Sequence, residues 1–365
     1  MNASSWISDM WAARGSLLKR APWAWAVLGS ILAWILIGVV TQRFSLGSLT
    51  INATAASFLA FVALGQMLVI TGGGGGIDLS VPYVITLSAY WSCGVMNGSD
   101  SRLLTGIAVA VGLGLVVGLA NAFVIIGLGM PPIVGTLAVG FLADSAVNVY
   151  ASHAKLGAPS PALADFVRGT FLGVPRLVVL AVVLAAAVGL GLRWMVAGRQ
   201  LVAVGQSEQA ARLSGVSVGR IRAGTYLVSS VLAGLTGLAL AGYNNSAFLN
   251  MGSPYQLASI GAVVLGGTFI AGGRSTAVGT VGGALFLTLV LTLMQSSKLE
   301  IGVQNVGEGI LIIAVLLVAG GGSGRGGDAR RGGWLRRVRP SSEVPASLGD
   351  HGGSRVSATP HEVQP

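Results

Sequence analysis

Five consecutive glycines and a carboxylate interrupt the longest apolar region of this chain. Gly72–Gly76 and Asp78 fall inside sequence that is otherwise almost continuously apolar from Ala53 to Met96. An interior glycine costs a helix about 1 kcal/mol relative to alanine, and a proline, here Pro82, costs about 3 kcal/mol. Backbone that leaves a helix at membrane depth is tolerated only where protein or a water-filled cavity surrounds it. The sequence therefore predicts a broken helix that lines a path across a membrane.

The composition supports a membrane setting for this break. Of the 365 residues, 53% are hydrophobic and 9% are charged, whereas soluble domains carry about 25% charged residues. The 56 glycines suit the close packing of helices in lipid. The single cysteine, Cys93, excludes an internal disulfide and a multi-cysteine metal site, and we expect it to be a packed core residue.

Ten apolar runs approach or exceed the roughly 20 helical residues that cross a hydrocarbon core. They cover about Trp23–Val40, Ile51–Ile70, Val81–Met96, Leu103–Leu128, Ile133–Tyr150, Leu177–Val196, Ala223–Ala241, Leu257–Ile270, Ala277–Met294 and Val306–Ala319. The first run is too long for a typical signal-peptide core, and no cleavage pattern follows it. The predicted fold is an all-α polytopic membrane protein, with about ten transmembrane helices and broken, glycine-rich helices around a central pathway.

The basic residues predict the orientation. With the N-terminus inside, the cytoplasmic side holds Arg14, Lys19, Arg20, Arg193, Arg199, Arg212, Arg220, Arg222, Arg274 and the tail, and the outer side holds Arg43, Arg102, Lys155, Arg168, Arg176 and Lys298. This bias favours cytoplasmic N- and C-termini. It also accounts for the net charge of +10, so we expect no nucleic-acid binding.

Three domains follow from this pattern. Residues 1–22 form a cytoplasmic N-terminal segment, residues 23–319 a transmembrane domain, and residues 320–365 a basic tail. Apolar residues in the tail do not recur at a helical or strand spacing, and we expect the tail to be disordered. Its arginines either sit on anionic lipid headgroups or only enforce the topology.

Motifs for catalysis or cofactor binding are missing from the sequence. No Walker A pattern occurs, so we expect no ATP binding by that route. The histidines His153, His351 and His361 are isolated, which argues against a metal site or a catalytic triad. We therefore expect neither an enzyme nor a cofactor in this chain.

Few ionisable residues fall inside apolar runs, and such residues are costly enough in a membrane to suggest function. Asp78 is interpreted as a helix N-cap, which is compatible with a place beside a pathway, and Pro82 suits the first turn of that helix. Asp144 either bonds a neighbouring helix or lines a pathway, and Glu308 lies near a span end, where it can face water.

A polar stretch between two predicted spans, about residues 199–222, is the second informative segment. Within it, Ala210, Ala211, Leu213 and Val216 predict a short helix with one apolar face, and Gly215 ends that helix. A short amphipathic helix on the cytoplasmic side can lie on the membrane or dock into a groove of a partner protein.

Four motifs, in order between about Ala63 and Val318, resemble permeases of the ATP-binding-cassette (ABC) import family. Glu208–Gly215 is similar to the EAA loop of these permeases, and Thr71–Val81 is similar to the T-G-G-I-D-L-S-V signature of the ribose/xylose-type monosaccharide branch. Ala262–Arg274, followed by Gly279-Thr280, and Pro132–Leu137 are the other two matches. The chain departs from the family pattern in its five glycines, in Pro82, in Gln209 at the EAA glutamate and in the pair Pro131-Pro132.

The resemblance implies a permease subunit in a bacterial inner membrane that moves a monosaccharide by alternating access. It implies three partners: a second permease copy or paralogue, an extracytoplasmic solute-binding protein, and a cytoplasmic ATPase that holds ATP and Mg. The ATPase would act on a coupling helix at about Ala203–Val218, through the coupling segment made of Glu208, Gln209, Ala210, Ala211, Arg212, Leu213, Ser214 and Gly215.

A second glycine break, Gly266-Gly267 through Gly272-Gly273, lies in the other half of the chain. Corresponding breaks in two halves indicate a central pathway. The residues expected along that pathway are Gly72, Gly73, Gly74, Gly75, Gly76, Asp78, Asp144, Gly266 and Gly267.

Three alternatives remain open from the residues. A branched-chain amino-acid permease would share the glycine-rich architecture. An ion-coupled secondary transporter could use Asp78 and Asp144 as its paired acids. A membrane scaffold would explain the glycine packing, although it would not explain the cytoplasmic motif.

Overall fold

Helices make up most of the residues that the computed structural model describes, which are 24–42, 46–153, 156–297, 300, 302–304, 306–307, 309–310 and 313–314. Within this part of the chain, nine predicted spans appear as α2 (Ala24–Thr41), α3 (Leu46–Thr71), α4 (Val81–Met96), α5 (Leu103–Ala122), α6 (Pro132–His153), α8 (Arg176–Trp194), α11 (Val218–Asn244), α12 (Tyr255–Leu265) and α13 (Ala277–Ser296). The N-terminal segment, Glu308, most of the predicted tenth span and the tail lie outside the described residues.

Six of the described helices are long and apolar enough to cross a membrane. They cover Gly47–Thr71, Asp100–Gly127, Pro132–His153, Arg176–Trp194, Val218–Asn244 and Ala277–Ser296. The helices α2, α4 and α12 are apolar but shorter. The prediction of an all-α polytopic membrane protein is confirmed, whereas the number of ten spans remains a prediction.

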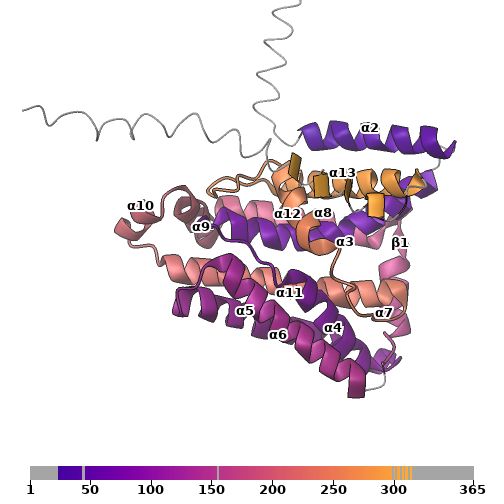
Figure 1. The fold of residues 1–365 in the computed structure, drawn as a ribbon, viewed down its shortest axis with the longest axis horizontal. Helices are drawn as coiled ribbons and strands as arrows, with labels where there is room; N and C mark the ends of the chain where they lie inside the picture. Colours follow the sequence, from indigo (N-terminus) through magenta and orange to yellow (C-terminus); the bar gives the residue numbers. More distant parts are fainter. Residues whose placement is uncertain are drawn as a thin grey trace, which may run out of the picture. The chain divides into compact units, whose positions relative to one another are not determined.

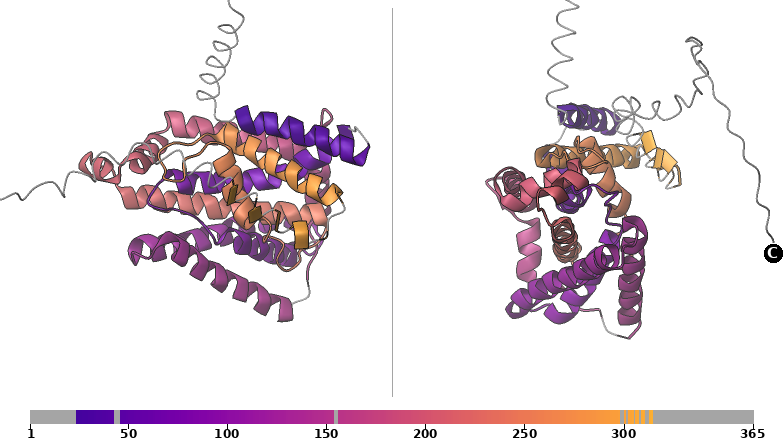
Figure 2. Two further views of the ribbon diagram at one scale, coloured as in Figure 1. Left: turned by 45° about the horizontal axis from the view of Figure 1, so that its top comes forward. Right: turned by 90° about the vertical axis from the view of Figure 1, so that its left-hand side faces the viewer.

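The long helix α11 lies at the centre of the described residues, and it packs against α3, α4 and α5 (Figure 1). On one side, α3 packs against α12 and α13, and α2 lies along α13. On the other side, α4 and α5 pack against each other, and α6 packs outside α4. The two further views in Figure 2 show the same succession of helices.

Glycines let α5 approach α11 closely. A Cβ atom added at Gly114 would lie 2.7 Å from the Cα of Val231, and one added at Gly118 would lie 2.8 Å from the Cα of Leu227. Without a hydrophobic driving force between helices in lipid, such backbone contact is a main source of helix association. The high glycine content is thus used here in helix packing.

Short elements connect the spans. A 3-10 turn η1 (Asp100–Arg102) precedes α5, and a π-helical turn η2 (Phe123–Gly127) follows it. The polar loop after α6 contains α7 (Pro161–Arg168) and a hairpin of β1 (Thr170–Phe171) and β2 (Val174–Pro175). Between α8 and α11 lie α9 (Val196–Gln206) and α10 (Glu208–Leu213), at the left end of Figure 1.

One predicted span was too long. The run Leu257–Ile270 was predicted as a span, but α12 ends at Leu265, directly before the predicted break at Gly266. The second glycine break begins there, and Gly267, Gly272 and Gly273 have φ angles of 86°, 91° and 75°. This left-handed backbone is readily adopted by glycine and ends regular helix.

Candidate functional site

The glycine break Gly72–Gly76 ends α3 with a left-handed turn. Gly73, Gly74 and Gly75 have φ angles of 66°, 65° and 72°, a region that costs L-residues with a Cβ roughly 1–2 kcal/mol each. The turn is closed by hydrogen bonds from Gly73 N to Ile70 O (3.0 Å) and from Gly76 N to Gly73 O (3.1 Å). The helix break predicted from the sequence is therefore present.

After this turn, the chain runs into the interior of the bundle without helical structure until α4 begins at Val81. Two contacts with α11 show how far this non-helical stretch extends into the bundle. Gly72 contacts Arg222, and Asp78 contacts Ser229, which lies two helical turns further along α11. Two turns correspond to about 10 Å.

Side chains satisfy the backbone of this non-helical stretch. Thr136 Oγ1 on α6 accepts a hydrogen bond from Leu79 N (3.0 Å). Gln66 on α3, in the amide orientation that its surroundings require, pairs with both the N–H and the carbonyl of Asp78 at 3.2 Å each. Non-helical backbone at membrane depth requires such partners, so Gln66 and Thr136 explain how the break is accommodated.

Asp78 is only 2% exposed and connects several elements. Its Oδ1 accepts hydrogen bonds from Ser80 N (3.0 Å) and Ser80 Oγ (2.6 Å), and its Oδ2 accepts one from Ser229 Oγ (2.9 Å). Asn121 on α5 donates to Ser80 Oγ (2.8 Å). The N-cap of α4 is Ser80, so the interpretation of Asp78 as the N-cap is wrong, whereas Pro82 does lie in the first turn.

Three glycine-containing segments meet beside the break. Gly273 N donates to Thr71 O (2.9 Å). A Cβ atom on Gly272 would lie 2.6 Å from the Cα of Gly73, and a Cβ atom on Gly205, near the end of α9, would overlap the Thr71 carbonyl oxygen. We call this the glycine junction, and it joins both glycine breaks to the segment that carries the EAA-like motif.

The coupling segment begins a separate helix. The predicted continuous helix Ala203–Val218 is wrong, because Ser207 is extended (φ −159°, ψ 104°) and separates α9 from α10. The Ser207 hydroxyl caps α10 by accepting a hydrogen bond from Ala210 N (3.3 Å). After α10, Gly215 has a φ angle of 80°, which agrees with its prediction as the end of the helix.

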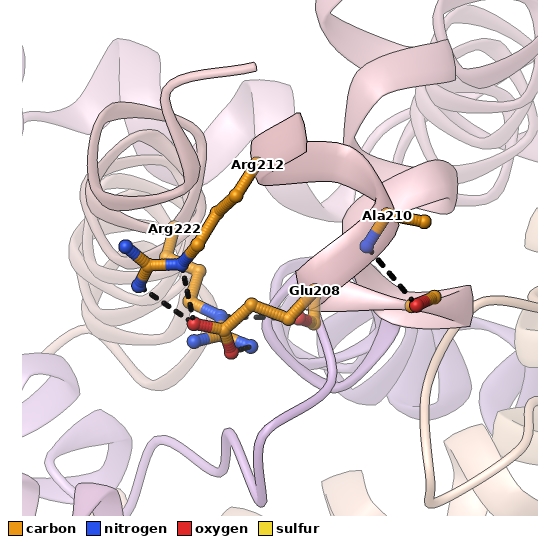
Figure 3. Close-up of polar contacts among 6 residues, drawn as sticks. Glu208, Ala210, Arg212 and Arg222 are labelled. Atoms are coloured by element: carbon orange, nitrogen blue, oxygen red, sulfur yellow. Dashed lines mark hydrogen bonds and ion pairs between the residues drawn. The ribbon is translucent and has the colours of Figure 1, made fainter. Parts of the chain in front are cut away.

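Glu208 lies between two arginines, as Figure 3 shows. Its Oε1 lies 2.7 Å from Arg212 Nη2, and its Oε2 lies 2.9 Å from Arg222 Nη2. The hydrogen bond from Arg212 and the nearby Arg222 guanidinium hold the pKa of Glu208 below its usual range, although partial burial opposes this shift. Glu208 therefore stays ionised at neutral pH.

Arg222 connects this ion pair to the glycine break. Its Nε donates to the carbonyl oxygen of Gly72 (3.1 Å), so Glu208, Arg222 and Gly72 form one contact chain. From the sequence, Arg222 was predicted only as one of the cytoplasmic basic residues. Its position inside the first turns of a long apolar helix was the available signal, because a charge there needs a partner.

A cavity of about 260 Å³ lies beside this contact chain and is lined by Gly73, Gly74, Gly76, Arg212 and Arg222, among other residues. The remaining predicted pathway residues, Gly72, Gly75, Asp78, Asp144, Gly266 and Gly267, do not line it. Asp144 is half-buried on α6 and accepts a hydrogen bond from Asn148 of the same helix (3.2 Å). Gly266 packs against the backbone of Gly279 and Thr280.

Most of the coupling segment is open to a partner. Gln209, Ala210, Arg212, Leu213, Ser214 and Gly215 are exposed. Leu213 in particular is 84% exposed, whereas Ala211 is buried and packs with Val204 and Val218. The described residues contain no group of His, Cys, Asp and Glu side chains that could hold a metal ion.

A family model described as "Branched-chain amino acid transport system / permease component" matches residues 48–320. The chain belongs to this permease family. A probable ABC transporter permease, y4mJ of Sinorhizobium fredii, is 34% identical over 80% of this chain and 87% of its own length. The ribose import permease RbsC of Escherichia coli K12 is 30% identical over 80% and 91%, and the autoinducer 2 import permease LsrD of Photorhabdus laumondii is 28% identical over 82% and 91%. No solved structure matches the chain.

The chain is thus a membrane permease subunit of an ABC importer. Subunits of this family form the transmembrane part of the importer and are not its ATPase. The resemblance inferred from the four sequence motifs is confirmed.

Proposed function

We propose that this permease moves a monosaccharide of the ribose or xylose type inward across a bacterial inner membrane. The similarity to a ribose import permease over 80% of the chain supports this substrate class. A fructose import permease of Bifidobacterium longum is also 30% identical, over 66% of the chain. Most of the Thr71–Val81 segment, with its sugar-permease-like sequence, forms the non-helical stretch between α3 and α4.

We further propose the partners of the subunit. Two permeases, identical or paralogous, work with a solute-binding protein outside and an ATPase inside, and the ATPase supplies the ATP and Mg sites. The full permease has ten spans, with both termini in the cytoplasm. In this orientation, the coupling segment and the end of α3 at Gly72 face the ATPase.

The observation that carries the mechanism is the contact chain from Glu208 through Arg222 to the Gly72 carbonyl, with distances of 2.9 and 3.1 Å. The ATPase docks on the exposed face of α10, where Leu213 protrudes. When ATP binding shifts α10, Glu208 displaces Arg222 and the glycine junction rearranges. The glycine break then opens or closes the inner end of the pathway.

Two of the alternatives are less well supported. Ion-coupled transport would use Asp78 and Asp144, but Asp78 is held by serine donors, and neither acid lines the 260 Å³ cavity. A branched-chain amino-acid substrate is supported by the wording of the family description. Relatives whose names give a substrate are import permeases for ribose, autoinducer 2 and fructose.

A competition experiment tests the substrate class. Cells that express the permease with its ATPase and binding protein take up labelled ribose, and unlabelled monosaccharides and branched-chain amino acids are added in excess. We expect monosaccharides alone to compete. Competition by leucine or isoleucine, without competition by sugars, would contradict the proposal.

Variants of the coupling segment test the mechanism in the same cells. Arg212→Glu reverses a charge beside Glu208, and Gly215→Pro forces φ near −65° where the structure has 80°. We expect both to abolish uptake while the ATPase still hydrolyses ATP. Uptake at the wild-type rate by both variants would refute a role for this segment.

A further inference from the structure

An apolar groove of about 570 Å³ lies between α5 and α8. Its floor is formed by α3 and α11, and its walls include Ile107, Leu180 and Leu184. All of its lining residues are apolar. A sugar would find no hydrogen-bonding group in it, so the groove is no part of a monosaccharide pathway.

One end of the groove lies at the starts of α5 and α8, where Leu103 and Leu177 line it. Leu163, Phe166 and Val167 of α7 also line the groove. Along α8, the lining residues extend over two helical turns, from Leu177 to Leu184, which is about 10 Å. Leu180 is 44% exposed and Phe166 is 46% exposed, so the groove is accessible from the side.

Two arginines lie next to the end of the groove at the starts of α5 and α8. Arg102 directly precedes the lining residue Leu103, and Arg176 directly precedes the lining residue Leu177. The Arg176 guanidinium carbon lies 5.9 Å from the centre of the Phe166 ring. Among the described residues, neither arginine forms an ion pair.

The other charged groups nearby leave this positive charge available. Asp100 accepts a hydrogen bond from Ala162 N (2.8 Å) at the start of α7, and the exposed Asp165 offers Arg176 only its backbone carbonyl (3.4 Å). Arg168 donates instead to the carbonyl of Tyr243 (2.6 and 3.0 Å). Arg102 and Arg176 are therefore the cations that can meet a bound anion.

We propose that this groove binds an acyl chain of an anionic phospholipid, whose phosphate lies beside Arg176 and Arg102. The apolar lining matches the chain, and the cations at one end match the headgroup. A spanning helix of a second copy fits less well, because the arginines would then face no anion.

Native mass spectrometry of the full chain, purified from mixed micelles with equal phosphatidylglycerol and phosphatidylcholine, tests the proposal. We expect retained phosphatidylglycerol to exceed phosphatidylcholine by about tenfold, which corresponds to about 1.4 kcal/mol, because two arginines lie beside the anionic headgroup. Leu180→Trp should reduce the retention of both lipids. Arg102→Gln combined with Arg176→Gln should abolish the preference.

Matched controls are Leu142→Trp, on the exposed face of α6, and Arg193→Gln, at the other end of α8. Both should retain lipid as the wild type does. Because Leu180 is partly exposed, its replacement by tryptophan leaves the core intact. Equal retention of the two lipids by the wild type, or unchanged retention in Leu180→Trp, would overturn the proposal. Disulfide cross-linking of two Leu180→Cys copies through their grooves would also overturn it, because a second subunit would then occupy the site.

Discussion

At the residue scale, the Arg222 side chain joins the coupling segment to the glycine break. It is one helical turn inside α11 and bonds both Glu208 and the Gly72 carbonyl. Arg222 can transmit a movement of α10 to the glycine break only while it contacts both Glu208 and Gly72. Its loss should therefore separate ATP hydrolysis from transport.

We expect Arg222→Gln to lower the ratio of uptake to ATP hydrolysis by at least about tenfold, which corresponds to about 1.4 kcal/mol. Uptake and phosphate release are measured on the same reconstituted importer. Arg220→Gln is the matched control, because Arg220 is exposed and bonds only Ser217 among the described residues. An unchanged ratio in Arg222→Gln would remove this residue from the mechanism.

Asp78 accepts hydrogen bonds from Ser80 and Ser229, so its removal should act on stability. Asp78→Ala leaves the buried Ser80 N–H and two serine hydroxyls without their acceptor, and we expect a loss of about 2–4 kcal/mol. Asp78→Asn, which keeps one acceptor, should lose less. Thermal unfolding in detergent gives the comparison, with Asp144→Ala as the half-exposed control. A larger loss in Asp144→Ala would contradict this role.

The lowered pKa of Glu208 predicts how coupling depends on pH. A carboxylate whose folded pKa is depressed contributes fully above its unfolded pKa of about 4.3, and its contribution is lost as the pH falls through the folded value. Between about pH 5.5 and 8, the uptake ratio of wild type to Glu208→Gln should therefore stay constant. A wild-type transition in this window that Glu208→Gln lacks would show that Glu208 titrates there.

At this scale, the sequence predicted the residues that break local patterns and missed their long-range partners. Asp78 and the glycines stand out because they interrupt apolar sequence. The pairing of Arg222 with Gly72 joins residues 150 positions apart, and Leu79 pairs with Thr136 across 57 positions. Periodicity and composition carry no information about such pairs.

At the scale of elements, the glycine junction brings together α3, α9 and the loop between α12 and α13. The sequence placed the two glycine breaks and the coupling segment separately, and their contact emerges only in the fold. The helix boundary at Gly215, which follows α10, was predicted because glycine readily ends a helix. The serine cap that separates α9 from α10 was missed, because Ser207 lies in otherwise helix-compatible sequence.

Gly205→Ala tests whether the glycine junction needs backbone contact. Its Cβ would overlap the Thr71 carbonyl, so we expect α9 to shift and uptake to fall by at least about tenfold, since overpacking costs about 1–3 kcal/mol. Gly224→Ala in α11 is the control, because a Cβ there meets nothing within 4 Å and alanine favours helix by about 1 kcal/mol. Wild-type uptake by Gly205→Ala would show that transport does not require backbone contact at the glycine junction.

At the scale of the whole molecule, a permease of this family supplies a membrane passage and depends on other proteins for energy. The chain contains no Walker A pattern, and its exposed α10 offers a surface through which an ATPase can act. The polytopic, helical class was predictable because apolar runs alone determine it. The depth to which residues 76–80 enter the bundle was not, since it depends on Gln66 and Thr136 from other helices.

Reconstitution into proteoliposomes tests whether the permease is part of an ATP-driven importer. The permease is combined with its ATPase, its solute-binding protein and ATP, and labelled monosaccharide inside the vesicles is measured. We predict uptake that requires the ATPase, the solute-binding protein and ATP, and that is lost when any one of them is omitted. Uptake by this chain alone, driven by a proton or sodium gradient, would show that it is not a subunit of an ATP-driven importer.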